Sequence, residues 1–130
     1  MKKIFKITAL ALVCIIALSA MTSCGRMYEG VQKKAEKAGF VCYPFEYGEM
    51  APLNRAIRSF GINAELKSAC YITNDIGEYA YLYEFDKISA ASSFAENFWA
   101  ITGICDGDLI IKRDNKVVIA AKESAIDKIW

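Results

Sequence analysis

The chain has 130 residues, of which 55% are hydrophobic and 12% aromatic, and its formal net charge is +1. This apolar content excludes a disordered chain, and the nearly neutral charge argues against a nucleic-acid-binding protein, which needs a basic surface. The chain has no histidine, so it cannot assemble a Ser-His or Cys-His nucleophile pair.

The first part of the chain has the pattern of an export signal. Three lysines stand near its start, namely Lys2, Lys3 and Lys6. An uncharged, mainly apolar run of 15 residues follows, over positions 7–21. That length suits the core of a signal peptide better than the ~20 residues needed to span a bilayer. Small residues come next and lead directly to Cys24.

Residues 18–25, Leu-Ser-Ala-Met-Thr-Ser-Cys-Gly, resemble the lipobox of bacterial lipoprotein precursors, with Met21 where leucine is most frequent. The resemblance implies that the Cys24 thiol takes a diacylglyceryl group and that the leader is cut just before it. A diacyl group is a sufficient membrane anchor, whereas one acyl chain binds only marginally. Two alternatives stay open: a secretory peptide cleaved at Ala20 or Ser23, and an uncut membrane anchor.

The lipoprotein interpretation divides the chain into three parts. Residues 1–23 are the signal peptide, 24–27 are the lipidated cysteine with a short tether, and 28–130 are a single small α+β domain. The mature chain keeps 13 of the 16 basic residues against 15 acidic ones, because three lysines leave with the leader. We therefore expect membrane lipid as a partner through Cys24, on the extracytoplasmic side of the cell membrane, and no nucleic acid. We expect no cofactor besides the covalent diacylglycerol.

The remaining elements follow from hydrophobic periodicity and turn residues. In chain order, the patterns predict a helix over 27–38, a strand over 40–47, a helix over 49–60, strands over 64–73 and 78–85, a helix that ends near 101, strands over 109–113 and 116–121, and a short helix or frayed tail over 122–130. Pro44 places the first strand at a sheet edge or at a bulge. Asp86 or Ser89 is the expected cap of the third helix.

This order contains the sequence β-α-β-β-α-β. It predicts an α+β fold, a ferredoxin-like split β-α-β sandwich with an extra C-terminal strand and flanking helices. Such a sheet has helices on one face, and its other face is open unless the terminal helices cover it. Because a fold does not specify an activity, function has to be argued from a site.

Aromatic alternation is the feature that suggests a binding site. The candidate residues are Tyr43, Tyr47, Tyr79, Tyr81 and Tyr83. Alternation puts the first two on one face of their strand and the other three on one face of theirs. If these faces are exposed, they form a flat platform that stacks sugars or packs a partner. The favoured alternative is that Tyr81, Tyr83 and Phe85 point into the core beneath the helices, because Glu84 needs the opposite face to reach water.

Acidic residues offer fewer candidates. The carboxylate pairs are Glu46 with Glu49 and Glu84 with Asp86, each at the end of a predicted strand. The spacing in residues 106–108, Asp-Gly-Asp, is similar to part of a calcium loop, but the further ligands of an EF-hand are missing. We therefore predict an ordinary turn there and no metal site.

Three cysteines remain in the mature chain, Cys42, Cys70 and Cys105, so that one disulfide at most can form. Their wide spacing lacks a Cys-x-x-Cys motif, and buried free thiols are the favoured interpretation.

Together these patterns predict a lipid-anchored, non-enzymatic binding module for an envelope protein or a small ligand. The alternatives are an envelope hydrolase that uses carboxylates and a thiol redox protein.

Overall fold

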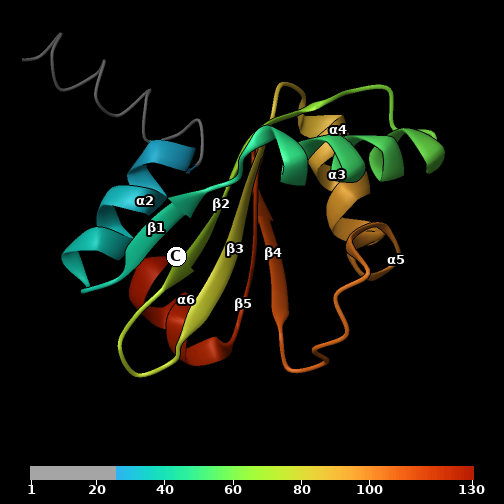
Figure 1. The fold of residues 1–130 in the computed structure, drawn as a ribbon. Helices are drawn as coiled ribbons and strands as arrows, with labels where there is room; N and C mark the ends of the chain where they lie inside the picture. Colours follow the sequence, from blue (N-terminus) through green and yellow to red (C-terminus); the bar gives the residue numbers. More distant parts are fainter. Residues whose placement is uncertain (1–25) are drawn as a thin grey trace, which may run out of the picture.

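The computed structural model describes residues 26–130, so the predicted signal peptide and Cys24 lie outside the described residues. Figure 1 shows the elements, which follow in the order α2 (Tyr28–Lys37), β1 (Val41–Pro44), α3 (Tyr47–Ser59), β2 (Leu66–Thr73), β3 (Tyr79–Phe85), α4 (Ile88–Glu96), α5 (Phe98–Thr102), β4 (Ile110–Asp114), β5 (Val117–Ala121) and α6 (Glu123–Ile129). The predicted α+β class is confirmed. The first strand is shorter than predicted, and the helix after it begins earlier.

The strands form one antiparallel sheet of five strands in the order β1-β2-β3-β5-β4. β3 and β4 lie on either side of β5, and the chain between them forms α4 and α5, which is a split β-α-β connection. The arrangement is compatible with a ferredoxin-like sandwich, although β1 and β2 are direct neighbours. The additional last strand, β5, therefore lies inside the sheet rather than at its edge.

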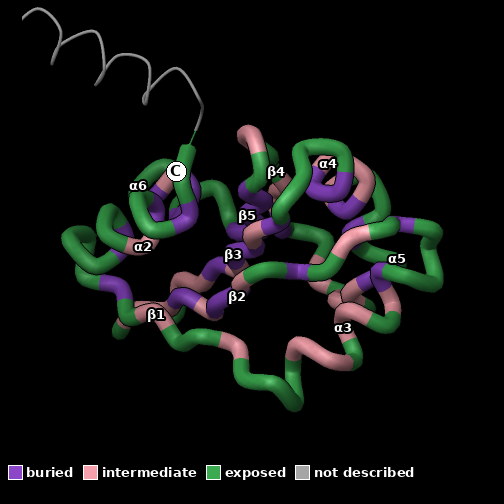
Figure 2. The backbone as a smooth tube through the Cα atoms, turned by 90° about the horizontal axis from the view of Figure 1, so that it is seen from above, coloured by how far each residue is buried: buried purple, intermediate pink, exposed green. Residues whose placement is uncertain are grey.

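Helices cover both faces of the sheet (Figure 2). α2 and α6 pack on one face, over a core that includes Val31, Ile72 and Ile129. α3, α4 and α5 pack on the other face, over a core that includes Phe94 and Phe98. All five residues of β5 are buried, as expected for a strand between two helical layers. The terminal helices thus cover the face that the sequence left undecided.

Two local predictions about the third helix are wrong. The helix is divided at Asn97, whose φ of −112° and ψ of 20° leave the helical region. The Asn97 backbone N–H and side-chain amide both donate to the Ser93 carbonyl oxygen, at 3.2 and 2.9 Å. Lys87, rather than Asp86 or Ser89, is the N-cap residue, and its side chain makes no capping hydrogen bond.

Arg26 joins the beginning of the described chain to its end. Its guanidinium lies 4.7 Å from the centre of the Trp130 ring and donates to the Trp130 carbonyl oxygen at 3.1 Å. It also forms an ion pair with Asp114 at 2.8 Å. Because Asp114 is the last residue of β4, Arg26 lies at the end of the sheet that carries the β4–β5 turn, opposite the β2–β3 turn (Figure 1).

Candidate functional site

Tyrosines from three strands lie side by side on one face of the sheet. The register places Tyr43 of β1 opposite Tyr71 of β2, and Tyr71 opposite Tyr81 of β3. Directly opposed residues of antiparallel strands point to the same face. Tyr79 lies two residues before Tyr81 and shares this face. We call these four residues the tyrosine face.

Three rings of the tyrosine face are packed against one another. The ring centres of Tyr71 and Tyr81 are 5.3 Å apart, and Tyr79 lies 6.0 Å from each of them. Tyr43 at the sheet edge is 54% exposed, whereas the other three side chains are half-buried. Three packed rings, with Tyr43 on the neighbouring edge strand, thus form an aromatic surface that stays in contact with water.

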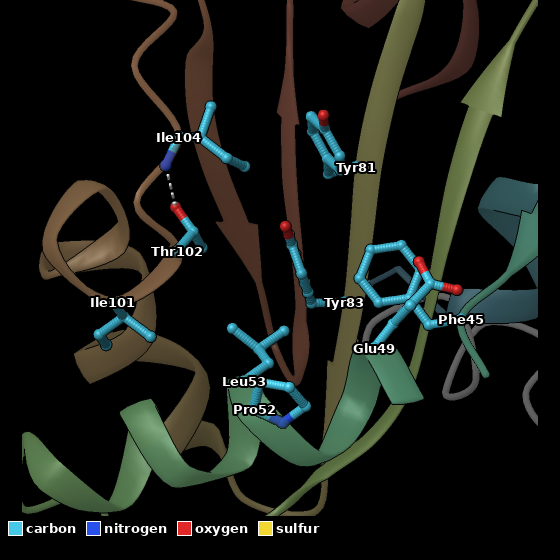
Figure 3. Close-up of a pocket in the computed structure, with 9 residues that line it drawn as sticks. All are labelled: Phe45, Glu49, Pro52, Leu53, Tyr81, Tyr83, Ile101, Thr102 and Ile104. Atoms are coloured by element: carbon cyan, nitrogen blue, oxygen red, sulfur yellow. Dashed lines mark hydrogen bonds between the residues drawn. The ribbon is translucent and has the colours of Figure 1, made fainter. Parts of the chain in front are cut away.

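A pocket adjoins the tyrosine face where α3 and α5 meet the sheet. Its volume is about 300 Å³, at the small end of the ~300–1,000 Å³ typical of ligand sites. Figure 3 shows its lining, which consists of Phe45, Glu49, Pro52, Leu53, Tyr81, Tyr83, Ile101, Thr102 and Ile104. Tyr81 belongs to both the pocket and the tyrosine face, so the two form one continuous surface.

Tyr83 is the most deeply buried polar residue of the pocket. Its side chain is 1% exposed, and its ring packs against Phe94 at 4.8 Å and Phe98 at 5.9 Å. The hydroxyl points into the pocket (Figure 3) and has no hydrogen-bond partner among residues 26–130. Burial raises the pKa of Tyr83, so the group stays a neutral donor. Because no side-chain oxygen or nitrogen of residues 26–130 is both buried and unpaired, water in the pocket reaches this hydroxyl, and a ligand can replace that water.

The other polar groups of the pocket differ in their freedom to bind a ligand. The Thr102 hydroxyl donates to the Phe98 carbonyl oxygen at 2.8 Å and accepts from the Ile104 amide at 3.3 Å. Glu49 is exposed, and one carboxylate oxygen accepts from the Glu46 amide at 3.3 Å. The pocket therefore offers apolar walls, the Tyr83 hydroxyl and one carboxylate, and no lysine or arginine lines it.

Asp106 contacts the tyrosine face through Tyr79. It comes from the loop between α5 and β4, and its carboxylate accepts a hydrogen bond from the Tyr79 hydroxyl. This bond raises the pKa of Tyr79 to about 12 and lowers the pKa of Asp106. Lys122 Nζ lies 5.8 Å from the centre of the Tyr79 ring. Tyr79 therefore contacts both an acidic and a basic side chain.

The predicted aromatic residues meet only in part. Tyr43, Tyr79 and Tyr81 lie together, and Tyr83 lies in the pocket beside them. Tyr47 is not part of the strand face, because β1 ends at Pro44 and Tyr47 begins α3 with 86% of its surface exposed. The prediction missed Tyr71, although it alternates in β2 with Cys70 and Ile72 and therefore points to the face opposite these two residues.

The acidic candidates are separated from this pocket, apart from Glu49. Glu84 and Asp86 line a second cavity of about 290 Å³ together with Lys67 and Lys116. Asp106 also accepts from the Asp108 amide at 3.1 Å, as in an ordinary turn. Within residues 26–130 we find no cluster of three or more cysteine, aspartate or glutamate side chains that could hold a metal ion.

Comparison with known protein families, with characterised proteins and with solved structures gives no match to this chain. None of the helices formed by residues 26–130 has the length and apolar character needed to cross a bilayer. The tyrosine face and the pocket are therefore the features of the fold that bear on function.

Proposed function

We propose that the protein is a bacterial lipoprotein, anchored through Cys24, whose domain binds a small ligand in the pocket and on the tyrosine face. The lipobox pattern supports the anchor. The Tyr83 hydroxyl carries the proposal for binding, because it points into a cavity, is open to water there and has no hydrogen-bond partner among residues 26–130, so it can donate to a ligand acceptor. Binding does not require any of the residue types that nucleophilic catalysis needs.

The lining limits the chemistry of the ligand. Apolar walls and tyrosine rings favour a ligand with a flat apolar face, such as a sugar ring or an aromatic side chain. The Tyr83 hydroxyl favours an acceptor at the inner end of that ligand. Glu49 at the pocket and Asp106 beside the tyrosine face disfavour an anionic ligand, since like charges repel.

The anchor is tested on the full chain produced in a bacterial host. Mass spectrometry of the protein from the membrane fraction should find Cys24 as the first residue with a diacylglyceryl thioether. The Cys24→Ser variant should no longer be found in the membrane fraction. An intact leader, or an unmodified Cys24 in the exported protein, would refute the anchor without affecting the proposal for the pocket.

The binding site is tested by NMR on the full-length protein with ¹³C-labelled tyrosines. We would titrate glucose, N-acetylglucosamine and phenylalaninamide as probes. A ligand in the pocket should shift the signals of Tyr81 and Tyr83 and leave the exposed Tyr47 unchanged. Tyr83→Phe should weaken binding by about 2- to 13-fold, the equivalent of one neutral hydrogen bond worth ~0.5–1.5 kcal/mol. Shifts confined to Tyr47, or none with any probe, would refute this site.

A carboxylate-dependent hydrolase is the second candidate, and it is favoured by the cavity that contains Glu84 and Asp86. If this candidate is right, the protein hydrolyses an envelope polymer, and Glu84→Gln abolishes this activity whereas Tyr83→Phe does not.

A redox enzyme receives less support, because Cys70 is fully buried and Cys42 half-buried. A reactive thiol needs exposure and a lowered pKa, whereas burial raises the pKa of Cys42 to about 11.

A further inference from the structure

Two of the three described cysteines lie together beneath α2. Cys42 of β1 is opposite Ile72, and Cys70 of β2 is opposite Pro44, so the cysteines are diagonal neighbours on one face of the sheet. Both belong to the core on the α2 and α6 side. Both are free thiols in this structure.

Gln32 of α2 contacts both sulfur atoms. Its side-chain amide donates to Cys70 Sγ at 3.5 Å, and its backbone carbonyl oxygen accepts from Cys42 Sγ at 3.9 Å. One residue of α2 therefore holds both side chains in the same small space.

Cys105 is on the other side of the sheet. It is exposed in the loop between α5 and β4, and its Sγ lies 3.4 Å from the Gly103 carbonyl oxygen. Its neighbours Ile104 and Asp106 contact the pocket and the tyrosine face. The sheet thus separates Cys105 from the other two thiols, and of the three pairings that the sequence allows only one is compatible with the fold.

We propose that Cys42 and Cys70 form a structural disulfide when the chain folds in an oxidising compartment, and that Cys105 stays reduced. The S–H bonds of both thiols break, and the new S–S bond forms by thiol–disulfide exchange. The two electrons and the two protons pass to an oxidant of the disulfide class, whose S–S bond breaks and which leaves as two thiols. The proposal does not depend on lipidation or on ligand binding.

The geometry requires a small adjustment of β1. Diagonal neighbours have Cα atoms roughly 7–8 Å apart, whereas a disulfide joins Cα atoms within ~7 Å. β1 has only four residues and is paired on one side alone, so it is the strand that can move. Because burial raises the pKa of both thiols, exchange is fastest before α2 covers them.

The disulfide would fasten the strand that carries part of the candidate site. Tyr43 of the tyrosine face lies directly after Cys42, and Phe45 of the pocket follows two residues later. An S–S bond to Cys70 would tie this edge strand covalently to β2 and would constrain the unfolded chain between the two cysteines. The unfolding midpoint in urea should therefore be higher for the oxidised protein than for the reduced one.

Tryptic peptides provide the test, because cleavage after lysine and arginine puts each cysteine on its own peptide: 38–55, 68–87 and 88–112. The full chain, with Cys14→Ser and Cys24→Ser, is refolded in a buffer of oxidised and reduced glutathione and alkylated with iodoacetamide. We expect peptide 38–55 linked to 68–87, and 88–112 alkylated. Alkylation of all three peptides, or a link to 88–112, would overturn the proposal.

Two variants complete the experiment. Cys105→Ser should keep the link and the raised urea midpoint, whereas Cys70→Ser should lose both. If Cys70→Ser fails to fold, the wild-type chain in its reduced form serves as the reference. An oxidised chain whose midpoint equals that of the reduced chain would overturn the structural role.

Discussion

The Tyr79 hydroxyl donates a hydrogen bond to the Asp106 carboxylate and so joins β3 to the loop between α5 and β4. We expect Asp106→Asn to bring the pKa of Tyr79 from about 12 toward its ordinary value of 10. The hydrogen bond that favours the neutral phenol becomes weaker, and the nearby negative charge is lost. NMR titration of labelled tyrosines measures this change, with Asp108→Asn as the matched control. An unchanged Tyr79 titration in Asp106→Asn would contradict the assignment.

Glu78 should make stability depend on pH. Its carboxylate accepts from Lys128 Nζ at 2.5 Å and from the Asn74 side chain at 2.9 Å, which lowers the pKa of Glu78 from 4.5 to about 2. A pKa that is lower in the folded state gives a stabilisation that is full above pH 4.5 and is lost as the pH falls through about 2. Glu78→Gln should therefore be less stable than wild type above pH 4.5, and the two should converge as the pH falls. Urea unfolding over this range measures the difference, and a constant gap would contradict the prediction.

Phe94 should be a main contributor to the core beneath α4. Its side chain is fully buried and its ring centre lies 4.8 Å from that of Tyr83 and 5.0 Å from that of Phe85. Phe94→Ala should lower the free energy of unfolding by about 3–5 kcal/mol, because the cavity that it leaves cannot close completely. Ile76→Ala is the control, since Ile76 is 76% exposed and surface changes stay within ~0.5 kcal/mol. Equal effects of the two substitutions in urea unfolding would refute this account of the core.

Two glycines should respond to alanine in opposite directions. Gly39 follows α2 with a φ of +89°, whereas Gly30 lies inside α2, and a Cβ at either position would meet nothing within 4 Å. Gly39→Ala should cost about 1–2 kcal/mol, because alanine is strained in the left-handed region. Gly30→Ala should raise the free energy of unfolding by about 0.5–1 kcal/mol, because the unfolded chain loses conformational freedom. Changes of the same sign in thermal unfolding would contradict this argument.

Local patterns were sufficient to predict the elements because each buried face repeats within one segment. The position of β5 in the sheet was beyond such patterns, since it depends on the pairing of Tyr83 with Val118, far apart in the chain. The break in the helix at Asn97 could not be predicted from local patterns either. Phe94 and Phe98 on either side of it continue the same buried face, so periodicity alone predicts an unbroken helix.

For the candidate site too, local sequence patterns predict which face of a strand a residue occupies but not which residues of other strands lie beside it. Alternation placed Tyr79, Tyr81 and Tyr83 on one face, which the register between β2 and β3 confirms. The importance of Tyr71 depends on that register, because only the pairing with Tyr81 brings it into the tyrosine face. The proximity of Cys42 and Cys70 likewise follows from pairing between strands that are separated in the sequence by a whole helix.

The attachment of Arg26 near the β4–β5 turn determines how an anchored protein would stand. Only Gly25 separates Arg26 from Cys24, a link that reaches at most ~7 Å. Acyl chains on Cys24 would hold this end of the sheet against the headgroups. Tyr79 begins β3 at the opposite end, roughly 20 Å away along a strand that rises ~3.3 Å per residue. The aromatic rings would then look outward from the bilayer, within reach of solutes that diffuse through the envelope.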